Sequence, residues 1–256
     1  MAKDLSPTST APYGAEIIEL TRAVLPALFA LRKAAIEQQK TTLNASGKMD
    51  EQNQAAAHGL AWLATYVQAL HQLQNWADKL SQTDKFGEVE QLLLQIAFGE
   101  YLSQILGGIP MSQGEITRLH DIGLTETTFA QPHVTALARS GNSPSARARL
   151  AALMAQQRAE ITTGAPGTDD EMEMIRVQFH RFAAQKVAPF AHDWHLKDEL
   201  IPLEIINELA DMGVFGLTIP EEYGGFGLPK IAMAVVSEEL SRGYIGVGSL
   251  GTRSEI

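Results

Sequence analysis

The sequence predicts an all-α fold in two parts. Apolar residues recur every three or four positions through most of the 256 residues, as they do on one face of an α-helix. Capping residues and Gly or Pro stops separate these periodic segments. The alternation of apolar and polar residues that marks a half-buried strand is nearly absent, and Gly216 to Ile219 is the single strand candidate.

The first part should contain three long helices. The first extends from Tyr13 to about Gln38, and a polar segment at 40–50 follows it. The second is expected over about 51–80, where apolar and aromatic residues lie on one stripe. Asp84 is a candidate N-cap for the third helix. That helix should end at Gly107-Gly108-Ile109-Pro110, because a left-handed glycine stops a helix and proline cannot continue one.

Three shorter helices should follow in this part. Ser112 and Glu115 have the S-x-x-E spacing of a capping box, which predicts a helix through His120. A brief helix is expected over about 128–138. Ser143 followed by Pro144 is typical of an N-cap and a first helical residue, so a helix is expected from there to about residue 160.

A change in composition divides the chain. The segment Thr162-Thr163-Gly164-Ala165-Pro166-Gly167-Thr168 has no charged residue and is rich in Thr and Gly, which is typical of a linker. We therefore predict a helical N-terminal extension at 1–162, a linker at 163–168 and a second helical domain at 169–256.

The second domain should consist of short helices. An acidic pair at 169–170 begins the first, because negative charge is favourable at a helix N-terminus, and its apolar stripe ends at Pro189. A second helix is expected from Pro202 to Gly213 and a third from about Pro229 to Leu240. A further helix begins near Val247.

The composition argues against several classes of protein. Without cysteine there is no disulfide framework, no thiolate zinc site and no cysteine nucleophile. No apolar run approaches the roughly 20 residues that span a bilayer, and the first residues do not resemble a secretory signal, so we expect a cytoplasmic protein without membrane insertion. The net charge is −10, and residues 169–256 carry −8 of it. This charge argues against nucleic acid and anionic membranes as partners, because both are polyanions.

Three motifs that resemble metal-binding or catalytic motifs have a structural explanation. His192, Asp193 and His195 are spaced so that they do not share one helical face, which favours exposed polar residues over a metal site; we predict no metal. Ser249 lacks the G-x-S-x-G pattern and the preceding strand of a nucleophile elbow. Gly224-Gly225-Phe226-Gly227 is too short for a dinucleotide loop and predicts a tight turn.

An ordered series of signals in residues 169–256 resembles the N-terminal domain of the acyl-CoA dehydrogenases. No single signal is specific, but five of them in this order within one domain are. They are Val187-Ala188-Pro189, a polar segment around Trp194, Pro202-Leu203-Glu204 with Met212-Gly213, Ile219-Pro220-Glu221-Glu222-Tyr223-Gly224-Gly225, and Ser237-Glu238-Glu239-Leu240-Ser241.

The resemblance implies a mechanism and a cofactor. Members of this family use FAD to oxidise the Cα–Cβ bond of an acyl-CoA, with a glutamate as base and an electron-transferring flavoprotein as electron acceptor. The segments that hold the flavin and the base are expected beyond Ile256, so no catalytic residue is assigned in this chain. The chain is then part of a larger enzyme, expected to be a homo-oligomer, and residues 1–256 alone are expected to show no turnover.

The resemblance also places the acyl end of the substrate cavity at residues 246–256. The candidate substrate-binding residues there are Gly248, Ser249, Thr252 and Arg253. Fatty-acyl members need small or apolar residues at this place, whereas a buried guanidinium requires an anion. We therefore expect a dicarboxylic acyl-CoA, whose free carboxylate would bind Arg253 through two hydrogen bonds. The alternative is a surface arginine that pairs with Glu255.

The extension at 1–162 is not part of the usual family architecture. It resembles that of a member whose substrate is a short branched dicarboxylic acyl-CoA, which supports the same substrate class. Packing, gating and oligomer contact all stay open as its role. Two rival functions remain: a non-catalytic helical interaction protein, which would not need the motif at 219–225, and a flavin oxidase or hydroxylase of the same fold.

Overall fold

A computed structural model describes residues 13–47, 51–112, 114–125, 129–157 and 161–255. Apart from one short hairpin, the regular elements of the described residues are helices, so the all-α prediction is confirmed. The chain divides into two compact units, unit 1 at residues 1–167 and unit 2 at residues 168–256. None of the helices in the described part of the chain combines the length and the apolar character that a membrane-spanning helix requires.

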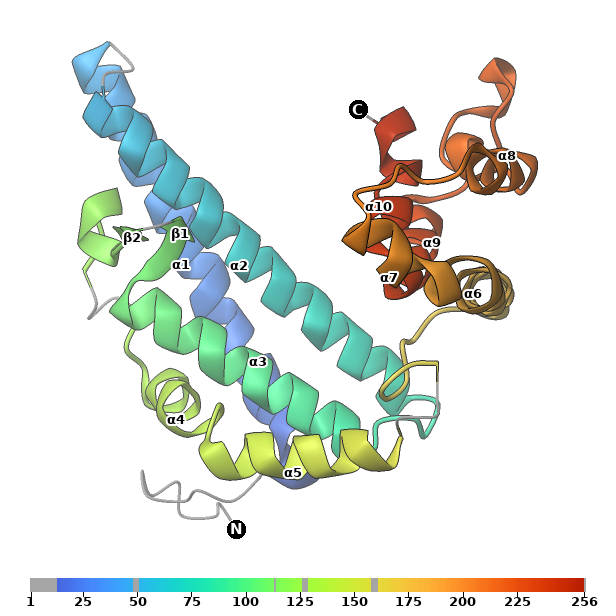
Figure 1. Ribbon diagram of the computed structural model, residues 1–256. Coiled ribbons are helices and arrows are strands. Elements are labelled where there is room, and N and C mark those ends of the chain that lie inside the picture. Colours follow the sequence, from blue (N-terminus) through green and yellow to red (C-terminus); the bar gives the residue numbers. More distant parts are fainter. Residues whose placement is uncertain (1–12, 48–50, 113, 126–128, 158–160, 256) are drawn as a thin grey trace. The chain divides into compact units, whose positions relative to one another are not determined.

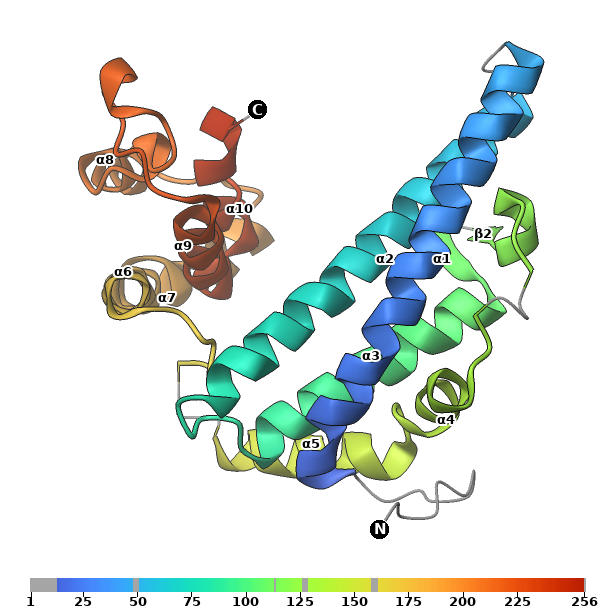
Figure 2. The ribbon, with the colours of Figure 1, turned by 180° about the vertical axis from the view of Figure 1, so that it is seen from behind.

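Unit 1 is built on three long helices that run up, down and up (Figure 1). They are α1 (Ile17–Ser46), α2 (Glu51–Ser81) and α3 (Glu88–Gly107), and a short 3₁₀ turn at Gly14–Glu16 precedes α1. Their facing stripes form one apolar core, in which Leu28, Leu63 and Phe98 are fully buried. Figure 2 shows α1 and α2 side by side along most of their length. The three predicted helices are confirmed, and the first extends to Ser46.

The end of unit 1 consists of shorter elements around this bundle. A 3₁₀ turn, η2 (Leu119–Ile122), is followed by α4 (Pro132–Ser140) and α5 (Pro144–Gln156). The Ser143 hydroxyl accepts a hydrogen bond from the backbone N–H of Ala146 at 3.2 Å, which confirms the predicted N-cap of α5. Phe129 and Val134 are fully buried and close the core beneath α4.

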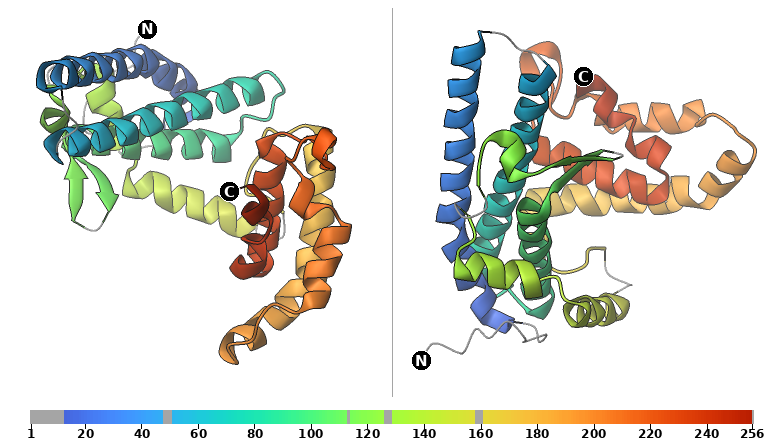
Figure 3. Two further views of the ribbon diagram at one scale, coloured as in Figure 1. Left: turned by 90° about the horizontal axis from the view of Figure 1, so that it is seen from above. Right: turned by 90° about the vertical axis from the view of Figure 1, so that its left-hand side faces the viewer.

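The predicted helix at Ser112 and Glu115 is wrong. These residues lie in an antiparallel hairpin of β1 (Ile109–Ser112) and β2 (Glu115–Thr117), visible from two sides in Figure 3. The Ser112 hydroxyl donates to the Glu115 carboxylate at 3.0 Å, so the two side chains bond to each other instead of capping backbone groups. Gly114 has a left-handed φ of 79°, which turns the chain where a helix would have begun.

The predicted N-cap of α3 is also wrong. Asp84 has φ 55° and lies before the helix, in the turn that follows α2. The N-cap residue is Gly87, whose N–H donates to the Glu90 carboxylate at 3.0 Å. Glu90 is therefore the side chain that satisfies a backbone donor at this helix start.

Unit 2 begins with a nearly continuous helical segment. It comprises α6 (Asp170–Phe182), a π-helical turn η4 (Ala183–Val187) and α7 (Ala188–Leu196). Asp169 caps it, because its carboxylate accepts from the backbone N–H of Met172 at 2.9 Å. Pro189 was predicted to end the helix, and that is wrong. Proline cannot donate to the preceding turn, and the π-helical turn before it changes the hydrogen-bond register so that the chain continues as a helix.

The rest of unit 2 packs on this segment. It consists of α8 (Leu203–Asp211), 3₁₀ turns η5 (Val214–Gly216) and η6 (Glu221–Tyr223), α9 (Lys230–Gly243), α10 (Ile245–Gly248) and a final 3₁₀ turn η7 (Gly251–Glu255). As predicted, Gly213 ends α8 in a left-handed conformation and Pro229 precedes α9. Leu209, Val236 and Leu240 are fully buried in a core separate from that of unit 1.

The strand predicted from Gly216 to Ile219 is wrong. Gly216 ends η5, and residues 217–219 form bends. Carbonyl groups of this segment accept from residues 226–228, including a 2.8 Å bond from the N–H of Gly227 to the carbonyl of Ile219. The turn predicted at 224–227 is confirmed: Gly224 and Gly227 have φ of 83° and 61°. An added Cβ at Gly225 would lie 2.1 Å from the carbonyl oxygen of Ile219, so this approach requires glycine.

Candidate functional site

The four residues predicted to bind substrate lie in one short segment of unit 2. Gly248 ends α10, Ser249 follows it, and Thr252 and Arg253 are in η7. We call residues 248–253 the candidate segment. Gly248 is buried, Ser249 and Thr252 are partly buried, and Arg253 is exposed. The segment therefore extends from the interior of unit 2 to its surface.

Two glycines hold the candidate segment close to its neighbours. An added Cβ at Gly248 would lie 1.9 Å from the Ser241 hydroxyl oxygen, which is far inside contact distance. An added Cβ at Gly251 would lie 2.9 Å from a methyl group of Val214. The glycines therefore let the segment pack directly on α9 and on η5, and these two elements determine its position.

The two hydroxyl groups of the segment donate to backbone carbonyls. Ser249 Oγ donates to the carbonyl of Gly246 at 3.0 Å, and Thr252 Oγ1 donates to the carbonyl of Ser249 at 2.8 Å. Their protons are thereby used, but each oxygen keeps acceptor capacity. In this arrangement the hydroxyls suit a ligand N–H better than a carboxylate.

Arg253 has its side chain exposed and its backbone N–H bonded to the carbonyl of Leu250 at 3.1 Å. Among the residues whose side chains the structure describes, none forms an ion pair with this guanidinium. The alternative partner Glu255 has its side chain outside the described residues. A planar guanidinium can bind a carboxylate through two parallel bonds.

A buried ion cluster between α6 and α9 was not predicted from the sequence. Arg176 on α6 is 4% exposed, and its Nη1 donates to Glu238 Oε2 and to Glu239 Oε1, both at 2.9 Å. Glu239 is fully buried, and its other oxygen lies 3.0 Å from His180 Nδ1 and 3.3 Å from Arg242 Nε. We call this set, which also includes Glu173 at 3.5 Å from Arg176 Nε, the α6–α9 ion cluster.

The contacts of the cluster change the acidity of its members. Burial raises the pKa of Glu238, but the hydrogen bond and charge of Arg176 lower it more, so that it lies below its ordinary value. Burial also opposes the charge on Arg176, and hydrogen bonds to Glu238 and Glu239 outweigh it and raise the pKa of the guanidinium. Both groups are therefore charged at neutral pH. Because Glu238 and Glu239 accept from Arg176, neither is free to act as a base.

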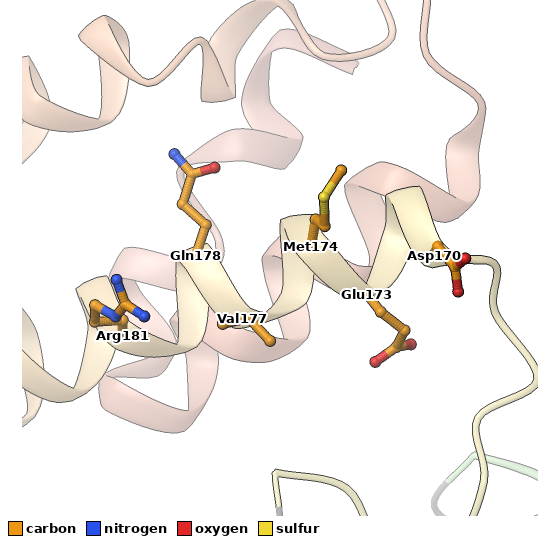
Figure 4. Close-up of a pocket in the computed structure, with 6 residues that line it drawn as sticks. All are labelled: Asp170, Glu173, Met174, Val177, Gln178 and Arg181. Carbon is orange, nitrogen blue, oxygen red and sulfur yellow. The ribbon is translucent and has the colours of Figure 1, made fainter.

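The other motifs lie elsewhere. His192, Asp193 and His195 are exposed near the end of α7, and the described residues contain no group of three metal-binding side chains. Figure 4 shows a shallow pocket of about 470 Å³ on the outer face of α6. Its lining residues include the exposed Met174 and Val177 but no residue of the candidate segment, so it is not the predicted acyl pocket.

The charged side chains and glycine-rich turns of the described residues are the features that bear on a flavin site. In unit 2 many of the described charged side chains pair with one another, in the α6–α9 ion cluster and in surface pairs such as Lys186 with Glu208. Within the described ranges no glycine-rich loop follows a strand, as a dinucleotide-binding turn would require. The described residues therefore contain no dinucleotide-binding turn.

Comparison with known proteins shows which proteins this chain is similar to. The family model "Acyl-CoA dehydrogenase, N-terminal domain" matches residues 169–256. The chain is 57% identical over 249 residues to (2S)-methylsuccinyl-CoA dehydrogenase of Cereibacter sphaeroides. The match covers 96% of this chain and 45% of that protein. This match is long enough to include most of unit 1. The chain spans less than half of that relative's length.

Other relatives share a shorter region. Glutaryl-CoA dehydrogenase of Desulfococcus multivorans is 35% identical over 75 residues, which is 28% of this chain and 19% of that protein. Isovaleryl-CoA dehydrogenase of Pongo abelii is 34% identical over 92 residues, which is 35% of this chain and 22% of that protein. Each match is about as long as unit 2.

Proposed function

We propose that this chain is the N-terminal part of an FAD-dependent acyl-CoA dehydrogenase. The premise is that residues 169–256 are an N-terminal domain of the acyl-CoA dehydrogenase family. The substrate is a short branched dicarboxylic acyl-CoA, and the reaction is the oxidation of (2S)-methylsuccinyl-CoA to mesaconyl-CoA. The single observation that supports this most strongly is the 57% identity to a (2S)-methylsuccinyl-CoA dehydrogenase over both units.

The chain's own residues contribute to binding rather than to the chemical step. Arg253 binds the free carboxylate of the acyl group. Its side chain is exposed in this chain rather than buried as expected, so support for the role comes from its place in a segment that two glycines hold against α9 and η5. Ser249 and Thr252 accept hydrogen bonds beside it. FAD, when bound by the rest of the enzyme, supplies the hydride acceptor. We expect the base in the rest of the enzyme, and Glu238 and Glu239 are instead bound to Arg176.

The location and partners follow from the same proposal. The enzyme acts in the cytoplasm, passes its electrons to an electron-transferring flavoprotein and forms a homo-oligomer. The role of unit 1 is packing, gating or oligomer contact, and its presence in the 57% identical relative supports a link to this substrate class.

Kinetics of the full-length protein test the proposal. The wild type should oxidise (2S)-methylsuccinyl-CoA, and Arg253→Met should raise KM for it about tenfold to a hundredfold, since a charge-assisted bidentate contact contributes about 1.5–3 kcal/mol. Isovaleryl-CoA, which has no free carboxylate, serves as the comparison substrate, and its kinetics should change little. Lys197→Met is the matched control, because Lys197 is an exposed cation of unit 2 outside the candidate segment.

The outcome also separates the rivals. A colourless full-length protein without flavin would favour a non-catalytic helical interaction protein. A flavoprotein that consumes oxygen but does not oxidise any acyl-CoA would favour an oxidase or hydroxylase of the same fold. Unchanged KM in Arg253→Met would reject the role of Arg253 while leaving the dehydrogenase assignment standing.

A further inference from the structure

Arg176 joins α6 to two consecutive carboxylates of α9 through a single nitrogen. Its Nη1 lies 2.9 Å from Glu238 Oε2 and 2.9 Å from Glu239 Oε1. Because adjacent residues of a helix point about 100° apart, one donor that binds both of them fixes the rotation of α9 as well as its distance from α6. Burial excludes water from the contact between Arg176, which is 4% exposed, and Glu239, which is fully buried, whereas the Glu238 side chain is half exposed.

The candidate segment is attached directly to the end of α9 that this contact fixes. The N–H of Tyr244 donates to Leu240 at 3.1 Å, and the N–H of Gly248 donates to Tyr244 at 3.1 Å. The close approach of Gly248 to Ser241 adds a steric contact with the same end of α9. A shift of α9 relative to α6 must therefore move the candidate segment.

The charges of the cluster show what the loss of Arg176 would do. Three carboxylates, Glu173, Glu238 and Glu239, face two guanidiniums and the imidazole of His180. Without Arg176 the buried Glu239 would keep only Arg242 and His180 as partners, and the carboxylate of Glu173 on α6 would repel those on α9. The expected response is a displacement of α9 away from α6.

We propose that Arg176 is a positioning residue for substrate binding, which it controls through α9 without touching the substrate. This inference rests on the proposed function, because it takes residues 248–253 as the part of the chain that contacts the acyl group. In this inference, Glu238 and Glu239 of the Ser-Glu-Glu-Leu motif accept hydrogen bonds from the Arg176 guanidinium. These contacts fix α9 and thereby determine where Arg253 lies.

A pair of variants separates positioning from stability. Arg176→Met leaves Glu239 charged, buried and short of a partner, so the full-length protein should lose thermal stability. In Arg176→Met/Glu239→Gln the unpaired charge is gone, so stability should recover toward that of the wild type. The contact that fixes α9 is absent from both variants. KM for (2S)-methylsuccinyl-CoA should therefore be raised about tenfold or more in both, as expected for an ångström-scale misplacement, with a smaller change in kcat.

The two explanations, positioning and folding, predict different results for KM in the double variant. A raised KM in that variant, despite recovered thermal stability, supports positioning. A KM that returns to the wild-type value together with stability would overturn the inference, because Arg176 would then act on folding alone. Lys197→Met, which removes an exposed cation of the same unit, should leave KM and stability unchanged.

A readout without turnover keeps this inference separate from the proposed function. Hydrogen exchange of residues 245–255 should become faster in both Arg176 variants, whether or not the protein oxidises any acyl-CoA. Wild-type protein that does not oxidise the substrate would defeat the proposed function. Unchanged exchange in residues 245–255 of both variants would defeat the positioning role.

Discussion

Arg176 and Glu239 form an ion pair of 2.9 Å in the interior of unit 2, where the carboxylate is fully buried. Their residue numbers differ by 63, and the pair joins the first long helix of the unit to the last. A buried ion pair of this kind contributes little net stability compared with apolar residues of the same volume, but the loss of one partner is costly. The main effect of the pair is therefore to fix the position of α9 relative to α6.

The first prediction concerns the stability of α9. Arg176→Met should lower the free energy of opening of α9 by about 3–5 kcal/mol, because it leaves a buried carboxylate without its main partner. Native-state hydrogen exchange of the α9 amides measures this free energy within unit 2 alone. A loss below about 1 kcal/mol would contradict the burial and pairing described above.

The second prediction concerns acid. The pKa of Glu238 is lower in the folded protein than its ordinary value, so the ionised carboxylate stabilises the folded state. This contribution to the free energy of unfolding is complete above the ordinary carboxyl pKa of about 4.3, and it is lost as the pH falls through the folded pKa. Unit 2 should therefore lose stability in this acidic range. In Glu238→Gln the acid-dependent loss should be smaller, as measured by unfolding at a series of pH values. Equal pH dependence in the two proteins would argue against the contact with Arg176.

The third prediction concerns the segment expected to be a linker. Its backbone is bonded to unit 1: the Ala165 N–H donates to Glu90 at 2.7 Å, Trp76 Nε1 donates to the Ala165 carbonyl at 3.0 Å, and Lys79 Nζ donates to the Gly167 carbonyl at 2.6 Å. Residues 164–167 should accordingly resist proteolysis.

Glu90→Leu removes the acceptor and tests this attachment. A hydrogen bond to a charged group contributes about 1.5–3 kcal/mol, so cleavage at 164–167 should accelerate about tenfold or more. Limited proteolysis with mass spectrometry locates the cuts. Glu88→Gln is the control, because Glu88 pairs with Arg149 and does not contact the segment. Equal cleavage rates in Glu90→Leu and the wild type would show that the attachment does not hold the segment.

The fourth prediction concerns Gly248. Alanine at this position would place a methyl group 1.9 Å from the Ser241 hydroxyl oxygen and 2.7 Å from the Ser241 backbone nitrogen, so α10 must move away from α9. The expected cost is about 1–3 kcal/mol of stability, with faster hydrogen exchange in residues 245–255. Gly107→Ala is the control, because no atom lies within 4 Å of the added Cβ there. Wild-type exchange in Gly248→Ala would show that the close approach is not required.

Local signals in the sequence were sufficient for most helices. Ser143 and Asp169 cap helices through bonds to residues three positions later, and such short-range chemistry can be read from the chain alone. The apolar stripes of the long helices likewise predicted the two cores. The family resemblance and the turn at 224–227 rested on short motifs of the same kind.

The wrong predictions arose where a competing contact decided the structure. Ser112 and Glu115 have capping-box spacing, but Gly114 turns the chain and lets the two side chains bond to each other in a hairpin. Pro189 usually stops a helix, yet a π-helical turn before it lets the helix continue. Each local pattern permits two outcomes, and packing selects one of them.

The α6–α9 ion cluster was beyond sequence reasoning for a different reason. Arg176 and Glu238 are 62 positions apart, and each is an ordinary charged residue of an amphipathic helix. Only the packing of α6 against α9 brings them together. The adjacent glutamates of the Ser-Glu-Glu-Leu motif were the available signal, because a glutamate on the apolar face of a helix must find a cationic partner.

A structure of the full-length protein with bound (2S)-methylsuccinyl-CoA tests the role of Arg253 most directly. We expect both nitrogen atoms at the end of the Arg253 side chain to lie about 2.7–2.9 Å from the free carboxylate of the acyl group. An Arg253 side chain that points into solvent, with the carboxylate bound by other residues, would refute the proposed substrate contact.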